Sequence, residues 1–276
     1  MTAAGRRHEA LRQRRPPKGS FAAVVTGAMV FQVTASSAAA IQGALVARAL
    51  GPAEKGTVAV ILLVPAVFGI LLAGGIGQAT VYLVGSGRVR VSDLTRHLVS
   101  FTLISTAVAY AASTAATVSG LSGRLLPGIP PSVVALAMLS VPMFFTTGYF
   151  LAVLRGLQRV VEASMLAAVQ AGALLLCIAV ALVVHPTPTG VVVANLVAQG
   201  IGLVLPAMRV RGAGARFVPA WDPAIVRAVL AFALRTHLGN VLQYFALRID
   251  VFILNSYAGV AAVGLYTVAV SLGELL

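Results

Sequence analysis

Long apolar stretches fill most of the chain and alternate with short polar connections. About eight of them are long enough to cross a bilayer as helices: roughly 21–50, 57–84, 94–118, 132–154, 160–184, 189–208, 225–257 and 260–276. Pro65, Pro142 and the glycine run 74–77 lie inside these stretches and should bend the helices. The pattern predicts an all-α polytopic membrane protein with about eight transmembrane helices.

Composition supports this class. Hydrophobic residues make up 59% of the 276 positions and charged residues only 10%, which excludes an ordinary soluble domain. Cys177 is the single cysteine and lies within a span, so an internal disulfide and a cysteine-based metal site are excluded. The histidines are too scattered to suggest a metal site. We expect no cofactor and no metal.

The net charge of +13 is distributed as in membrane proteins rather than in nucleic-acid-binding ones. With the N-terminus placed in the cytoplasm, most basic residues fall on the cytoplasmic side of alternate loops. They are Arg6, Arg7, Arg12, Arg14, Arg15, Lys18, Arg88, Arg90, Arg96, Arg155, Arg159, Arg209, Arg211, Arg216 and Arg227. This asymmetry predicts a multi-pass protein of the cytoplasmic (inner) membrane. Residues 1–19 are expected to form a disordered basic cytoplasmic tail that anionic lipids attract.

Two transmembrane lobes are expected. Residues 20–208 would form a first lobe of six helices, 209–223 a cytoplasmic linker, and 224–276 the start of a second lobe, so the sequence looks cut short. Asp222 and Pro223 fit the N-cap and first position of the helix after the linker. At an offset of 208 residues, GPAEKG at 51–56 matches GVAAVG at 259–264. A six-helix unit followed by its copy is typical of transporters, although coincidence in an apolar sequence is the alternative.

The richest polar pattern in a span runs from His237 to Tyr266. On a helix, His237, Asn240, Tyr244, Arg248 and Asn255 share one face, and Gln243 and Asp250 share the next. A charge facing lipid at this depth costs about 3 kcal/mol or more. Arg248 and Asp250 should therefore border a polar cavity, or else form a pair that joins two helices.

Each of the other candidate cavity residues has more than one interpretation. Asp250 could bind a driving H⁺ or Na⁺, or balance an arginine. Asn240 and Gln243 could bind sugars or neighbouring helices. Arg48 near a span end could extend to the interface instead of the cavity, and His237 could meet headgroups. Gln32 lies on a small polar stripe of the first span and could line the same cavity.

Three stretches carry a family resemblance: ALVARALGPAEKGTVAV, AGGIGQATVYLVG and LRIDVFILNSYAGVAAVGLYTVAVSL. The sequence resembles the polysaccharide flippases, the polysaccharide transporter branch of the multidrug/oligosaccharidyl-lipid/polysaccharide superfamily. It departs from them near Ala73, where an acidic residue usually stands. The resemblance implies a two-lobed helical-bundle transporter that moves polyprenyl-pyrophosphate-linked oligosaccharide by alternating access.

The resemblance implies a transporter and not an enzyme. No phosphate-cradling GxxxxGK[ST] sequence is present, and no sizeable loop gathers catalytic side chains. Polysaccharide assembly proteins are possible partners; nucleic acid is not expected. Arginine suits the pyrophosphate because its planar fork donates several hydrogen bonds. The alternatives are a multidrug or small-cation exporter of the same fold, and a non-transporting membrane scaffold for polysaccharide assembly.

Overall fold

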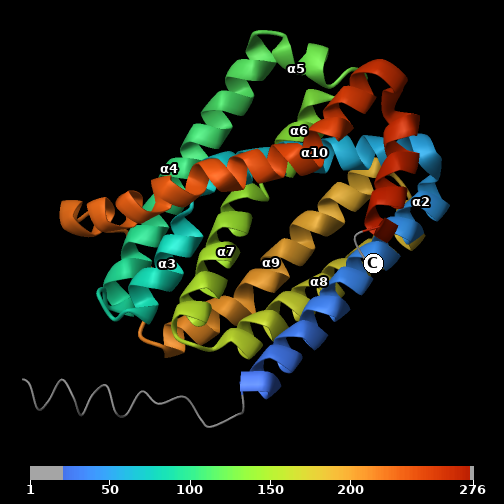
Figure 1. Cartoon of the computed structure of the whole chain (residues 1–276). Helices are drawn as coiled ribbons and strands as arrows, with labels where there is room; N and C mark the ends of the chain where they lie inside the picture. The colour runs from blue at the N-terminus through green and yellow to red at the C-terminus, as the bar shows by residue number, and fades with distance from the viewer. Residues whose placement is uncertain (1–20, 274–276) are drawn as a thin grey trace, which may run out of the picture.

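The computed structural model describes residues 21–273, without the side chains of 271 and 272. This part of the chain contains helices and turns but no strand, which confirms the all-α prediction (Figure 1). The helices are α2 (Phe21–Ala73), α3 (Ile76–Gly85), α4 (Val91–Val118), α5 (Leu121–Leu125), α6 (Pro131–Met138), α7 (Val141–Gly156), α8 (Val160–Val184), α9 (Pro188–Gly212) and α10 (Pro223–Gly273). The predicted tail 1–19 lies outside the described residues.

The helices have the length and surface of membrane spans. In the described residues, six helical stretches are long and apolar enough to cross a bilayer, with α6 and α7 counted together. Large apolar side chains cover the outside: Leu176 is 67% exposed and Val183 is 85% exposed. Counting both arms of the bent helices α2 and α10 gives the eight segments that the sequence predicts. The protein is a polytopic membrane protein.

Glycine and proline set the helix breaks largely as expected. Gly74 (φ 57°) and Gly75 (φ 72°) adopt left-handed backbone and separate α2 from α3. Pro142 lies in the first turn of α7, directly after the break that ends α6. Pro65, in contrast, lies within helical backbone of α2, where Gly51 has the non-helical dihedral angles.

The two bent helices reverse through the same backbone conformation. Gly51 has φ 81° and ψ 172°, and Gly259 has φ 76° and ψ 175°. These glycines are 208 residues apart, so the sequence match corresponds to a structural equivalence at this turn. In Figure 1, α10 crosses the bundle, turns back on itself and lies beside α2.

The two turns pack against each other reciprocally. A Cβ added to Gly56 would lie 1.6 Å from the carbonyl oxygen of Val260. A Cβ added to Gly264 would lie 1.9 Å from the carbonyl oxygen of Pro52. Gly56 and Gly264 are equivalent under the 208-residue offset, and so are Pro52 and Val260. Only glycine lets the backbones approach this closely.

The connection between α9 and α10 is tied to α4. Asp222 donates its backbone N–H to Nε2 of His97 (2.8 Å), and Ser100 Oγ donates to the carbonyl of Ala220 (2.8 Å). Asp222 also caps α10, as predicted, because its Oδ1 accepts from the N–H of Ala224 (2.9 Å). The segment 213–222 is therefore a packed strap over α4 and not a loose tether.

The first arm of α10 joins the main apolar core. Val226, Val229 and Ala233 are buried with side chains of α3, α4 and α7 in one cluster. This packing fixes the rotation of α10 about its axis. The polar residues that follow Ala233 on α10 therefore have a fixed orientation relative to these neighbouring helices.

Candidate functional site

A cavity of about 370 Å³ lies where the α2–α3 break, α7 and the first arm of α10 meet. We call it the α3–α7–α10 cavity. The break contributes Ile70, Ala73, Gly75, Gly77 and Gln78, α7 contributes Phe144, Phe145, Gly148 and Tyr149, and α10 contributes Asn240, Gln243, Tyr244 and Leu247. Its size falls within the range of small-ligand pockets, about 300–1,000 Å³.

Glycine 75 places α10 against this cavity. A Cβ at Gly75 would lie 2.4 Å from the carbonyl oxygen of Ala233 and equally near Thr236 Oγ1. Its left-handed backbone ends the α2 helix at the same point. One glycine thus breaks α2 and lets α10 approach, and the cavity opens beyond the contact.

Three predicted site residues share this cavity. Asn240, Gln243 and Tyr244 are spaced three and four residues apart on α10, so their side chains lie on adjoining parts of one helix face. Gln243 is exposed, and Asn240 and Tyr244 are half-buried. Together they offer two amides and a phenol, which can both donate and accept hydrogen bonds.

Arg248 and Asp250 lie one to two turns further along α10 and do not line this cavity. Asp250 accepts hydrogen bonds from the hydroxyl of Tyr266 and from the N–H of Val251 (2.8 Å). Tyr266 belongs to the second arm of α10, so this bond joins the two arms across the Gly259 turn. Arg248 is half-buried and follows Tyr244 by one helical turn, so it lies on the same face of α10 beyond the cavity residues.

The other predicted residues lie apart from this cavity. Arg48 lines a separate groove between the first arm of α2 and the second arm of α10. Gln32 is exposed on the first arm of α2. His237 is half-buried, and its Nδ1 atom is buried without a hydrogen-bond partner among the described residues.

Tyr149 is a cavity residue that sequence reasoning missed. It is 3% exposed, it stacks on Phe145 with ring centroids 6.1 Å apart, and it lines the cavity. Its hydroxyl is buried and has no hydrogen-bond partner in the described part of the chain. A buried hydroxyl normally finds a partner, so Tyr149 brings an unsatisfied polar group to the packing around the cavity. The signal in the sequence was a phenol in the apolar span FFTTGYF.

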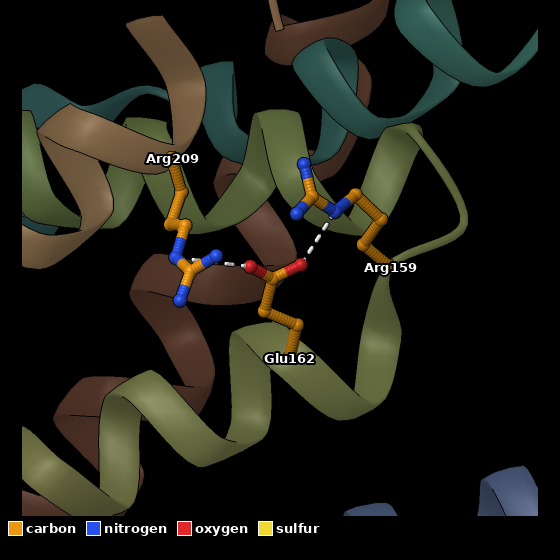
Figure 2. Close-up of polar contacts among 3 residues, drawn as sticks. All are labelled: Arg159, Glu162 and Arg209. Carbon is orange, nitrogen blue, oxygen red and sulfur yellow. Dashed lines mark ion pairs between the residues drawn. The ribbon is translucent and has the colours of Figure 1, made fainter. Parts of the chain in front are cut away.

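A second polar centre, also missed, lies where α7, α8 and α9 meet (Figure 2). The carboxylate of Glu162 pairs with Nε of Arg159 and lies 3.4 Å from Nε of Arg209. Figure 2 shows the carboxylate between the two guanidinium groups. Arg159 and Glu162 are three residues apart, the spacing of a local helix pair, whereas the contact with Arg209 depends on tertiary packing. This centre ties helix ends together.

Among the described residues, no group of three His, Cys, Asp or Glu side chains is placed to hold a metal ion. The α3–α7–α10 cavity instead combines aromatic faces with neutral hydrogen-bonding groups. Such a surface can bind a hydroxyl-rich molecule through hydrogen bonds and packing against aromatic rings.

Comparison with known proteins bears on identity. The model of a family described as polysaccharide biosynthesis protein matches residues 45–276. No curated protein and no solved structure matches the chain. The match covers most of the chain, including every residue that lines the cavity. The chain belongs to the polysaccharide biosynthesis protein family.

Proposed function

We propose that the protein is a flippase or exporter that moves polyprenyl-pyrophosphate-linked oligosaccharide across the cytoplasmic membrane by alternating access. The observation that carries the proposal is the α3–α7–α10 cavity, which Asn240, Gln243, Tyr244 and Tyr149 line together. The family's role in polysaccharide biosynthesis supports a sugar-containing substrate.

The saccharide would occupy the cavity and the pyrophosphate would lie toward Arg248. Amides and phenols bind sugar hydroxyls, and the aromatic rings of Phe144 and Tyr149 can pack on the apolar faces of a sugar ring. Arg248 follows Tyr244 by one helical turn, and its guanidinium suits phosphate oxygens. The lipid tail would stay outside, along the exposed apolar helices.

The Gly51 and Gly259 turns would be the pivot for alternating access, because both bent helices reverse there and pack against each other. Asp250 would either bind H⁺ or Na⁺ or compensate the charge of Arg248. In both cases its hydrogen bond with Tyr266 would change in strength. The N-terminus would lie in the cytoplasm, and polysaccharide assembly proteins would supply and collect the substrate. Transport of this kind requires no catalytic group in the protein.

An exporter of drugs or small cations is the nearest rival. Such a protein would prefer acidic groups in its cavity. None of the side chains that line the α3–α7–α10 cavity in the described residues is a carboxylate. This observation favours a hydroxyl-rich substrate over a cationic one.

The test measures where lipid-linked saccharide accumulates. Cells that lack the protein should build up lipid-linked saccharide on the inner leaflet, and the wild-type chain should restore its export. Asn240→Ala and Arg248→Ala should lower export by about tenfold each, whereas Arg124→Ala, an exposed change on α5, should not. Normal distribution of the lipid-linked saccharide in the deletion strain would reject the flippase. Full export by both the Asn240→Ala and the Arg248→Ala variants would reject only the site.

A further inference from the structure

A second pocket, of about 600 Å³, lies between the end of α3 and the first arm of α10. Two cations line it: Arg88, in the connection from α3 to α4, and Arg235, on α10. We call it the arginine pocket. It shares no lining residue with the α3–α7–α10 cavity, so it is a distinct site.

A stack of three side chains holds Arg88 in place. The guanidinium carbon of Arg88 lies 5.2 Å from the ring centroid of Tyr82, and Tyr82 stacks on Phe232 with centroids 4.9 Å apart and planes 13° apart. A cation over an aromatic face is held electrostatically while its edge N–H groups stay free to donate. Phe232 precedes Arg235 by three residues, so the same helix face carries both the stack and the second cation.

Small residues keep the pocket open on the α10 side. Ala224, Ala228 and Ala231 line it at intervals of four and three residues, ending at Arg235. This spacing follows one face of a helix. Leu83 and Val89 form the opposite apolar wall. The pocket is therefore an apolar groove with two cations, which fits an amphiphilic anion better than a free ion.

The two charges are uncompensated by protein groups. No carboxylate lines the arginine pocket, and within residues 21–273 the ion pairs of the structure do not include Arg88 or Arg235. The pocket begins at the ends of α3 and α10, and Arg235 lies twelve residues, about 18 Å, into α10. Both guanidiniums are exposed beside apolar surface, so they are available to bind an anion.

We infer that the arginine pocket binds the phosphate head of a lipid, with the guanidiniums on the phosphate oxygens and the chain along the alanine face. Arg88 and Arg235 supply charge-assisted hydrogen bonds, and Ala224, Ala228 and Ala231 leave room for the adjoining methylene groups. The lipid is either an anionic phospholipid or a lipid-linked pyrophosphate. The inference does not rest on the proposed transport function.

The experiment measures lipid binding to the purified full chain in nanodiscs of zwitterionic lipid. Three probes are titrated separately: phosphatidylglycerol, a polyprenyl pyrophosphate and inorganic pyrophosphate. Arg88→Gln and Arg235→Gln should each weaken the binding of at least one lipid probe by about tenfold, since each removes charged hydrogen bonds. Ala228→Phe should weaken it as well by filling the groove without changing the charge. Arg227→Gln is the matched control, an exposed arginine on the same helix that does not line the pocket.

The outcomes distinguish an anionic phospholipid from a lipid-linked pyrophosphate as the bound lipid. Selective loss of polyprenyl pyrophosphate binding supports the site and assigns it to a lipid-linked substrate, and loss of phosphatidylglycerol binding supports it as a site for membrane lipid. If Arg227→Gln weakens lipid binding as much as the pocket variants, the site is wrong. Lipid binding that is unchanged in all pocket variants, or no tighter than that of inorganic pyrophosphate, also overturns the inference. Because transport is not measured, failure here leaves the proposed function intact.

Discussion

At the scale of single residues, the polar groups of α7 and α10 differ in whether a partner inside the protein satisfies them. Asp250 accepts a hydrogen bond from the hydroxyl of Tyr266, and this bond joins the two arms of α10. Tyr149 is the opposite case, because its hydroxyl is buried at a cavity wall without a protein partner among the described residues. A satisfied group contributes mainly to stability, whereas an unsatisfied one at a cavity is free for a ligand.

Replacing Tyr149 by phenylalanine should therefore separate binding from stability. The apparent melting temperature in detergent should stay the same or rise slightly, because a buried hydroxyl without a partner is removed. The affinity for lipid-linked saccharide should fall about fivefold to tenfold through loss of one hydrogen bond. Tyr110→Phe, on α4 and outside the cavity, serves as the control and should leave that affinity unchanged. A lower melting temperature for Tyr149→Phe would show that the hydroxyl has a structural partner after all.

At the scale of helices, backbone-to-backbone contact between α2 and α10 depends on two glycines. A Cβ added to Gly56 or to Gly264 would lie 1.6 or 1.9 Å from a carbonyl oxygen of the opposite turn, and no side chain tolerates such a distance. Membrane helices gain little from burying apolar surface against each other, so close approach through small residues has to supply the packing.

Adding one methyl group at this contact should be strongly destabilising. Gly56→Ala or Gly264→Ala should cost roughly 1–3 kcal/mol or more, because the backbones must move apart. Thermal unfolding of the purified protein would measure the loss. Gly172→Ala is the matched control: it is a helical glycine of α8 with open space at its Cβ, and alanine there should stabilise by about 1 kcal/mol. Equal stability of all three variants would contradict the close contact.

The strap between α9 and α10 makes a second prediction about elements. His97 accepts a hydrogen bond at Nε2 from Asp222 and lies 2.7 Å from the carbonyl of Asp93 at Nδ1, so Nδ1 carries the proton. His97→Ala removes this link, which is worth about 1 kcal/mol. Trypsin should then cleave after Arg216 about fivefold faster in native conditions, because the strap opens more often. His185→Ala, at the far end of α8, should leave the rate unchanged; cleavage of His97→Ala at the wild-type rate would show that other contacts hold the strap.

For the whole molecule, the distribution of charge predicts its orientation in the membrane. Basic residues gather in the α3–α4 connection and at the α9–α10 strap, and few lie in the turns at the opposite ends of the helices. Loops rich in arginine and lysine stay in the cytoplasm. We therefore expect the arginine pocket to lie on the cytoplasmic side.

Labelling single cysteines would test this orientation. In a Cys177→Ala background, Ser86→Cys after α3 should react with a membrane-impermeant maleimide only after the membrane is opened. Ser119→Cys, after α4, should react in intact cells (or spheroplasts, where an outer barrier exists). Both serines are exposed, so access and not burial decides the result. The reverse pattern would invert the assigned topology and move the arginine pocket to the exterior.

The sequence was informative wherever a property depends on residues close together in the chain. Glycine runs predicted the break at Gly74 and Gly75, and Asp222 before Pro223 predicted a helix cap; both are confirmed. The offset of 208 residues pointed to equivalent turns, and Gly51 and Gly259 share one backbone conformation. The division into lobes and the assigned site residues remain predictions.

The candidate site was harder to predict, because it depends on which distant surfaces meet. Helix periodicity grouped Asn240 and Tyr244 correctly, yet it could not show that Gln243 shares their cavity while Arg48 and Gln32 do not. Tyr149 and Gln78 looked like ordinary members of apolar spans. Their position at the cavity results from the approach of α10 to Gly75.

By itself, the sequence determined that this protein crosses a membrane repeatedly as helices, because apolar length and local breaking residues suffice for that. It also determined the two sharp reversals, since glycine alone adopts their backbone angles readily. Tertiary structure alone decided which polar groups are satisfied, how the 213–222 strap is held, and that Arg88 and Arg235 share one pocket. The physical reason is that hydrogen bonds and packing join residues that are far apart in the chain, and no local pattern records their distance.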